Sequence, residues 1–227
     1  MLILAPLFLG ISCNTLEKAS VHGLTSGYYR MDSGKESRKV YVDVSGEKID
    51  IYDVKGLING NHLMAPIPIF NSDSLLIRPL KLKKQSLDID ITTILLKYRP
   101  SISGLPRQLT NELNMALYAG WRHDNFRIRS SSDPLGRAYR KSNNLGYDFG
   151  IFAGPGTTPV NPFSTNGRTG NDYSGMILQT GIAAFIESNI ASFGVAIGAD
   201  QLMNRDRKIW IYHKKPWVGF VVGIALN

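Results

Sequence analysis

The sequence predicts an all-β protein, an antiparallel up-and-down transmembrane β-barrel of about eight strands preceded by a small N-terminal β segment. Two observations support this prediction. Within residues 86–227, apolar residues recur at every second position of several segments, which is the period of a β-strand. The opposite face of these segments is often Gly or Ala rather than Lys, Glu, Thr or Ser. Large apolar residues on one face and small residues on the other fit the wall of a narrow barrel.

The segment 218–226 shows this alternation most clearly. Gly219, Val221, Gly223 and Ala225 form its smaller face, and larger apolar residues form the other. In a membrane barrel, the larger set faces lipid and the smaller set fills the interior. The residues predicted to face lipid are Val218, Phe220, Val222 and Ile224.

Six further segments with this alternation lie upstream. These expected strands are 87–98, 109–122, 126–130, 145–153, 176–187 and 190–200. Membrane barrels usually have an even number of strands, so an eighth is expected, either at 209–212 or in the N-terminal segment. Tight connections are predicted at 123–125 and 187–189, and longer links at 131–144, 154–173 and 204–215. Short turns combined with long polar loops are typical of outer-membrane barrels.

Residues 14–85 are predicted to form a separate β-rich segment. A hairpin is expected from strands 39–44 and 48–52, joined by a turn at 45–47. Shorter strands are expected at 27–30 and 75–78, and the Gly- and Pro-containing stretch 57–74 is predicted to be mainly loop. The predicted organisation is therefore a signal sequence over 1–13, this segment over 14–85, and the barrel over 86–227.

Cys13 is the single cysteine of the chain, so an internal disulfide is excluded. It follows an apolar run, residues 1–12, and this arrangement resembles a bacterial lipoprotein signal. Ser12 suits the position before the cysteine, but Gly10 stands where Leu is usual, and no Lys or Arg precedes the run. Three interpretations stay open: lipidation of Cys13, a plain cleaved signal peptide, or a retained apolar N-terminus. The first two place the protein outside the cytoplasm.

The composition favours a packed, membrane-associated protein. The chain is 43% hydrophobic, and no stretch after residue 13 approaches the ~18 apolar residues of a membrane helix. Any membrane span must therefore consist of strands. The net charge of +8 comes mainly from loops and strand ends. Nucleic acid is not an expected partner, because no recognised nucleic-acid-binding motif accompanies these basic residues. Basic loops beside anionic lipid headgroups are the preferred interpretation.

No catalytic residue, metal site or cofactor is predicted. The four histidines lack the spacing of a zinc motif, and no Ser/His/Asp pattern can be drawn from spacing alone. Asp88 and Asp90 share a strand face, as acid–base pairs can, but inside a barrel they are expected to pair with inward Arg or Lys, because an unpaired buried charge is costly. The predicted interior charge network is Asp88, Asp90, Glu112, Arg122 and Asp148.

Residues 86–227 resemble a small outer-membrane β-barrel of a Gram-negative bacterium. Residues 217–227 are similar to the C-terminal strand by which the barrel-assembly machinery recognises its clients, although Asn227 stands where a terminal aromatic residue is usual. The segments 98–100, 105–108, 208–212 and 215–217 resemble an uncharacterised group of such proteins. This resemblance implies an outer-membrane location. The implied partners are outer-membrane lipids, the barrel-assembly machinery during biogenesis, and other outer-membrane proteins.

The function expected from these observations is non-enzymatic. The protein would be a structural or accessory subunit of an envelope assembly, or would bind surfaces through its long loops. About eight strands leave no room for a wide pore. The alternative is a soluble envelope lipoprotein with a lipocalin-like barrel that binds an apolar ligand and turns Val218, Phe220, Val222 and Ile224 inward. An envelope hydrolase would need a convergent polar site, which the sequence does not show.

Overall fold

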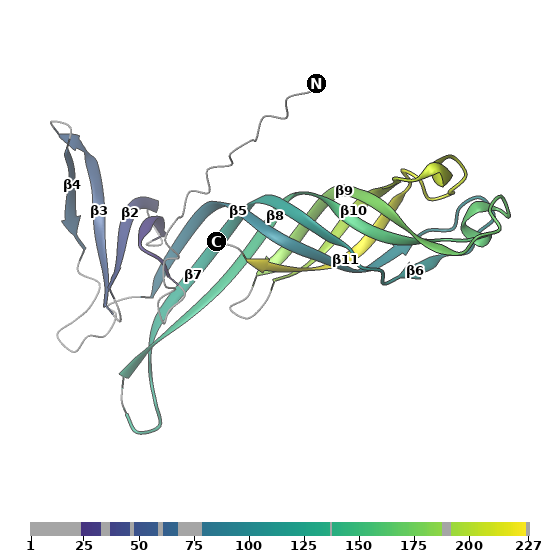
Figure 1. Ribbon diagram of the computed structural model, residues 1–227. Helices are drawn as coiled ribbons and strands as arrows, with labels where there is room; N and C mark the ends of the chain where they lie inside the picture. Colours follow the sequence, from purple (N-terminus) through teal and green to yellow (C-terminus); the bar gives the residue numbers. More distant parts are fainter. Residues whose placement is uncertain are drawn as a thin grey trace.

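A computed structural model describes the chain over residues 24–32, 37–45, 48–58, 61–67, 79–136, 138–187 and 192–225. Eleven strands and two 3-10 helices occur in these residues, and the strands pair antiparallel (Figure 1). The strands are β1 (Gly27–Asp32), β2 (Ser37–Ser45), β3 (Lys48–Ile58), β4 (Asn61–Pro66), β5 (Leu80–Arg99), β6 (Gln108–Thr110), β7 (Met115–Ser132), β8 (Ala138–Val160), β9 (Tyr173–Glu187), β10 (Ser192–Leu202) and β11 (Pro216–Ala225), and the 3-10 helices are η1 (Phe163–Thr165) and η2 (Arg205–Lys208). The prediction of an all-β antiparallel protein is confirmed. No helix in the described residues has the length and apolar character needed to cross a membrane.

Six strands form a ring of pairings. β5, β7, β8, β9, β10 and β11 pair in this order, and β11 pairs back with β5 between Asp90 and Tyr98. We call these six strands the ring, and Figure 1 shows them wrapping around one another. Nearer its start, β5 pairs with β1 instead, at Lys81–Lys83. The described ring therefore contains six strands rather than about eight, and residues 209–212 are not a strand.

The difference in strand number comes largely from one continuous strand. The segments 109–122 and 126–130 were expected as two strands, but β7 runs through the predicted turn at 123–125. Asp and Asn favour turns in general. Here, however, Asp124 is buried and its carboxylate accepts hydrogen bonds from Arg122 Nε at 3.0 Å and from Asn144 Nδ2 at 3.2 Å. These partners satisfy the carboxylate within the sheet, so the prediction of a turn is wrong.

Other element boundaries also differ from the prediction. β8 covers parts of both long links expected at 131–144 and 154–173, and β4 lies in the stretch 57–74 that was expected to be mainly loop. The expected hairpin is confirmed as β2 and β3, with Ser45 opposite Lys48. The strand expected at 75–78, the centre of the turn at 187–189 and Cys13 with its preceding apolar run lie outside the described residues.

Strands β1 to β4 form a sheet that continues from the first part of β5. We call these four strands the extension sheet; they lie at one end of the ring (Figure 1). Tyr29, Val40 and Ile51 from this sheet pack with Leu82 of β5 and Phe126 of β7 in one core. β5 thus belongs to both the sheet and the ring, and it crosses the border expected between residues 85 and 86 without interruption.

The buried face of the ring is filled by side chains from all six strands. Tyr118, Phe152, Phe185 and Trp217 are the largest members of this core, and each is at most 4% exposed. Glycines lie between these aromatic side chains. The close packing around the glycines explains why this face of the strands carries small residues. At Gly198, an added Cβ would lie 2.6 Å from Cζ2 of Trp217 and 2.8 Å from the carbonyl oxygen of Thr180.

Replacing Gly198 with Ala should therefore destabilise the fold by about 1–3 kcal/mol, because the indole ring or the backbone must move. Gly170→Ala is the matched control, since a Cβ there would meet no atom within 4 Å. Urea unfolding of the refolded protein measures the difference. Equal unfolding midpoints for the two variants would contradict a tightly filled ring.

Candidate functional site

The outer face of the ring is apolar and carries no charge over its central part. Trp121 and Ile151 are 68% and 65% exposed. Within the described residues 87–98, 115–121, 145–159, 174–186, 193–201 and 216–222, no exposed side chain is charged. We call this surface the apolar belt. Its large members are Leu87, Ile89, Leu95, Leu96, Tyr98, Met115, Leu117, Trp121, Leu145, Tyr147, Phe149, Ile151, Met176, Leu178, Ile182, Ile186, Phe193, Val195, Ile197, Val218 and Phe220. Soluble monomeric proteins rarely expose contiguous apolar surface on this scale.

Three of the four residues predicted to face lipid lie on this outer face. Val218 is 48% exposed and Phe220 is 40% exposed, and Val222 is partly exposed. Trp217 and Val221, on the opposite face of β11, are fully buried. The structure does not describe the side chain of Ile224.

The height of the apolar belt is close to the apolar band of membrane barrels. In β8 every exposed residue from Leu145 to Pro155 is apolar or aromatic, over a length of eleven residues. At ~3.3 Å per residue, this is about 36 Å along the strand. With the ~40° tilt common in membrane barrels, it spans about 28 Å, close to their apolar band of ~25 Å. Exposed basic side chains lie beyond both borders: Lys81, Lys83, Arg127 and Arg129 at one end, and Arg205, Arg207 and Lys208 at the other.

Exposed aromatic residues lie at both borders of the belt. Trp121 and Tyr98 are exposed there, as residues of a membrane interface would be. Trp210, Tyr212 and Trp217 also lie at or near strand ends, but they are only 3%, 2% and 0% exposed. These three rings pack inside the molecule instead, where they contact buried polar groups.

Buried carboxylates gather inside the ring at the end nearest the extension sheet. We call Asp88, Asp148 and Glu187, from β5, β8 and β9, the acidic cluster. They are 2%, 2% and 4% exposed, and one carboxylate oxygen from each lies within 4.8 Å of the other two. Tyr118 donates a hydrogen bond to Oδ1 of Asp148 at 2.8 Å.

Among the described residues, Arg122 is the basic residue that forms ion pairs with this cluster. Its guanidinium pairs with Glu187, and its Nε lies 3.0 Å from Oδ2 of Asp124. Its Nη1 lies 4.0 Å from Oδ2 of Asp88. Despite these contacts, Oδ2 of Asp88 and Oδ2 of Asp148 are buried and accept no hydrogen bond from the described residues. The cluster therefore contains more carboxyl groups than this guanidinium pairs with.

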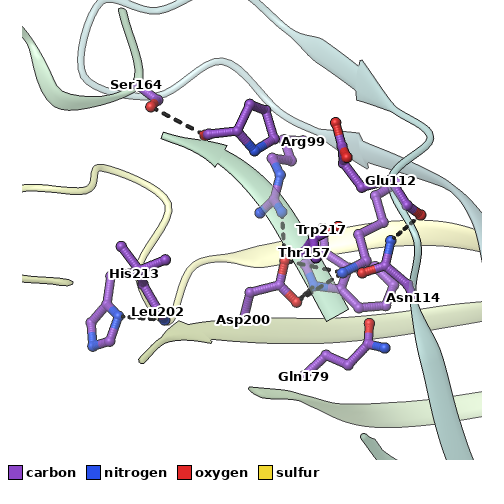
Figure 2. Close-up of polar contacts among 12 residues, drawn as sticks. Arg99, Glu112, Asn114, Thr157, Ser164, Gln179, Asp200, Leu202, His213 and Trp217 are labelled. Carbon is purple, nitrogen blue, oxygen red and sulfur yellow. Dashed lines mark hydrogen bonds and ion pairs between the residues drawn. The ribbon is translucent and has the colours of Figure 1, made fainter. Parts of the chain in front are cut away.

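The structure brings together most of the predicted interior charge network. Asp88, Arg122 and Asp148 meet as described, and Asp90 is buried two residues further along β5. Glu112 is separate from them. It lies partly buried in the link between β6 and β7, where its carbonyl oxygen accepts a hydrogen bond from Asn114 Nδ2 at 2.7 Å (Figure 2).

Sequence reasoning did not assign Glu187, Asp124 or Tyr118 to this network. It placed Asp124 in a turn, Glu187 where an expected strand meets a turn, and Tyr118 on an expected strand. Continuing the period of two one step beyond Phe185 would have placed Glu187 on the buried face. The same reasoning missed a second buried group at the other end of the ring.

This second group contains both signs of charge. We call Lys97, Arg99, Asp200 and Trp217 the Asp200 cluster; all four are at most 2% exposed. The Asp200 carboxylate accepts hydrogen bonds from Lys97 Nζ at 3.1 and 3.2 Å, from Arg99 Nη2 at 2.5 Å and from Trp217 Nε1 at 2.9 Å. Figure 2 shows Arg99 and Trp217 converging on Asp200. The cluster joins β5, β10 and β11, which includes the pairing that returns the ring to β5.

An apolar cap covers this end of the ring. Trp210 and Tyr212, from the link after η2, pack with Leu105 and Leu202. The guanidinium of Arg99 lies 5.4 Å from the ring centre of Trp210 and 5.1 Å from that of Tyr212, within cation–π range. His213 Nδ1 accepts a hydrogen bond from the Leu202 N–H at 3.2 Å (Figure 2). Burial, together with Lys214 and Arg207, lowers the pKa of His213 and so favours this neutral, accepting form.

No protein-family profile matches this chain, and neither does any curated protein or solved structure. Its resemblance to outer-membrane barrels therefore stays a prediction from the sequence. The chemistry of the site is read from its geometry. The apolar belt suits contact with hydrocarbon. The Asp200 cluster pairs one carboxylate with two cationic side chains, and the acidic cluster offers hard oxygen ligands.

Proposed function

We propose that this protein is a non-enzymatic, integral protein of the bacterial outer membrane. Its ring is a six-stranded transmembrane β-barrel. The barrel anchors the extension sheet at the periplasmic face, as a structural or accessory part of an envelope assembly. The observation that carries this proposal is the apolar belt, because a charge-free outer face of membrane height is costly in water and favourable in lipid.

The arrangement of the links supports the proposed orientation. Outer-membrane barrels have short turns on the periplasmic side and longer loops outside. β9 and β10 are separated by only four residues at the end that carries the extension sheet, whereas 13 residues separate β10 from β11 at the opposite end. The sheet would therefore lie in the periplasm. A lipid on Cys13, if present, would attach to the same face of the membrane.

The filled ring favours an anchor over a channel or a carrier. Aromatic and aliphatic side chains occupy its centre, so a porin-like path for water has no space. A lipocalin-like protein would turn Val218 and Phe220 toward an internal ligand, but both residues are exposed on the outer face. The basic side chains at the loop end, including Arg168, Arg205 and Lys208, suit anionic lipid headgroups there.

Membrane extraction tests this proposal. The protein should remain in membranes washed with carbonate and urea, and unboiled samples should migrate differently from boiled ones on a denaturing gel. A version with residues 1–13 replaced by a cleavable signal sequence is the control, because it lacks any lipid anchor. If the wash releases this version as a folded soluble protein, the proposed membrane barrel is contradicted.

A further inference from the structure

Two carboxylate oxygens inside the ring lack the partners that buried charges require. Oδ2 of Asp88 and Oδ2 of Asp148 are buried, and no described group donates a hydrogen bond to either. A buried polar atom normally has such a partner, and an unpaired buried carboxylate is especially costly. Both atoms belong to the acidic cluster, so something that neutralises negative charge is needed at this point.

Arg122 alone does not meet this need. Its guanidinium is already engaged by Asp124 and Glu187, and its nearest nitrogen to Asp88 Oδ2 is 4.0 Å away. Tyr118 uses its hydroxyl on the other oxygen of Asp148, at 2.8 Å. The neighbouring donors therefore bind other atoms, and Oδ2 of Asp88 and Oδ2 of Asp148 receive no hydrogen bond from them.

We propose that the acidic cluster binds one divalent cation of the size of Ca²⁺ through the carboxylates of Asp88, Asp148 and Glu187. The geometry fits this class of ion. Ca²⁺ binds oxygen ligands at 2.3–2.6 Å, so two oxygens on one ion lie up to about 5 Å apart. The three carboxylate oxygens of the cluster lie within 4.8 Å of one another. Carboxylates are hard ligands, which favours Ca²⁺ over softer metals that prefer sulfur or imidazole.

Two glycines give the carboxylates in and beside the cluster the space that they occupy. A Cβ at Gly120 would lie 2.5 Å from Oδ1 of Asp148, and a Cβ at Gly146 would lie 2.8 Å from Oδ1 of Asp124. Larger residues at these positions would displace the carboxylates. Arg122, which pairs with Glu187 of the cluster, has a side chain that is 22% exposed. The cluster thus adjoins a partly solvent-exposed side chain at the end of the ring nearest the extension sheet.

Binding to the full chain refolded in detergent micelles tests this site independently of its location in a cell. Tb³⁺ is a luminescent substitute for Ca²⁺, and Tyr118 beside Asp148 provides an aromatic sensitiser. We expect tyrosine-sensitised Tb³⁺ emission that Ca²⁺ displaces, and a Ca²⁺-dependent rise in unfolding temperature relative to protein in chelator. Tyr118→Phe should lower the emission while the unfolding temperature still responds to Ca²⁺.

Asp148→Asn should weaken Tb³⁺ binding at least tenfold and abolish the Ca²⁺-dependent rise. Asp172→Asn, in an exposed loop, is the matched control and should respond as the wild type does. If Asp148→Asn does not fold, Asp88→Asn replaces it with the same expectation. A wild type that responds to neither ion would overturn the site, and so would equal responses in the cluster and control variants. In that case the carboxylates are neutralised by protons alone.

Discussion

Replacing Ile197 with Arg is expected to cost about 2–4 kcal/mol of folding free energy in a lipid bilayer. Ile197 lies at the centre of residues 193–201 and is 54% exposed. On either side it is paired with Ile182 and Val218, which are also exposed and apolar. If this surface contacts hydrocarbon, the guanidinium loses its hydration at the depth where that loss costs most. If the same surface contacts water, the substitution is nearly neutral.

Leu135→Arg is the matched control for this substitution. Leu135 is also exposed, at 74%, but it lies in the turn between β7 and β8, beyond the apolar belt. Its replacement should change the folding free energy by no more than about 0.5 kcal/mol. Urea titration of folding into phospholipid vesicles, read by heat-modifiable gel mobility, compares the two. Equal midpoints would mean that the belt does not contact hydrocarbon.

The period of two was sufficient to predict which residues of most strands share a face. In β10, for example, Phe193, Val195 and Ile197 alternate with smaller residues, and the structure exposes the larger set. This succeeds because successive side chains of a strand point to opposite sides whatever the tertiary fold. Sequence alternation alone does not specify whether the large or the small face is buried. The prediction that the large face is outside relied on the absence of polar residues from both faces.

A bulge in β5 hid part of the Asp200 cluster from sequence analysis. The pairing of β11 with β5 shifts register between Phe220 and Val221, so Leu95 and Leu96 are both exposed. After this point the buried positions become Lys97 and Arg99, whereas a strict period of two from Asp90 would have placed residues 96 and 98 inside. A bulge depends on how the neighbouring strand pairs, and that information is not local in sequence.

The acidic cluster and its neighbour Asp124 were predicted only in part, again because some of their contacts join residues that are distant in sequence. Asp88 and Asp148 follow the local alternation of their strands, so their burial could be predicted. Asp124 and Glu187 lie in segments with turn-like composition, where local propensity suggested a connection. Their partner Arg122 lies on a different strand from Glu187. At Asp124, hydrogen bonds within the sheet, including one from Asn144 of β8, thus override the local turn preference. At Glu187, the last residue of β9, the ion pair with Arg122 of β7 accompanies its burial.

Replacing Asp200 with Ala is expected to destabilise the protein by about 3–5 kcal/mol, because it leaves Lys97 and Arg99 buried without a counter-ion. The Asp200 side chain is fully buried and accepts hydrogen bonds from three residues on two other strands. Removing it also deletes the side-chain link from β10 to the paired strands β11 and β5. Lys97→Met should cost less, because the pair between Arg99 and Asp200 survives.

Chemical unfolding in detergent micelles, with Asp172→Ala as the exposed control, measures these differences. A combined variant that replaces Lys97 and Arg99 with Met and Asp200 with Leu tests the cause. Replacing a whole buried ion cluster with apolar residues of similar volume is often close to neutral. The combined variant should therefore recover much of the stability that Asp200→Ala loses. If Asp200→Ala unfolds at the same denaturant concentration as Asp172→Ala, the cluster does not stabilise the closure of the ring.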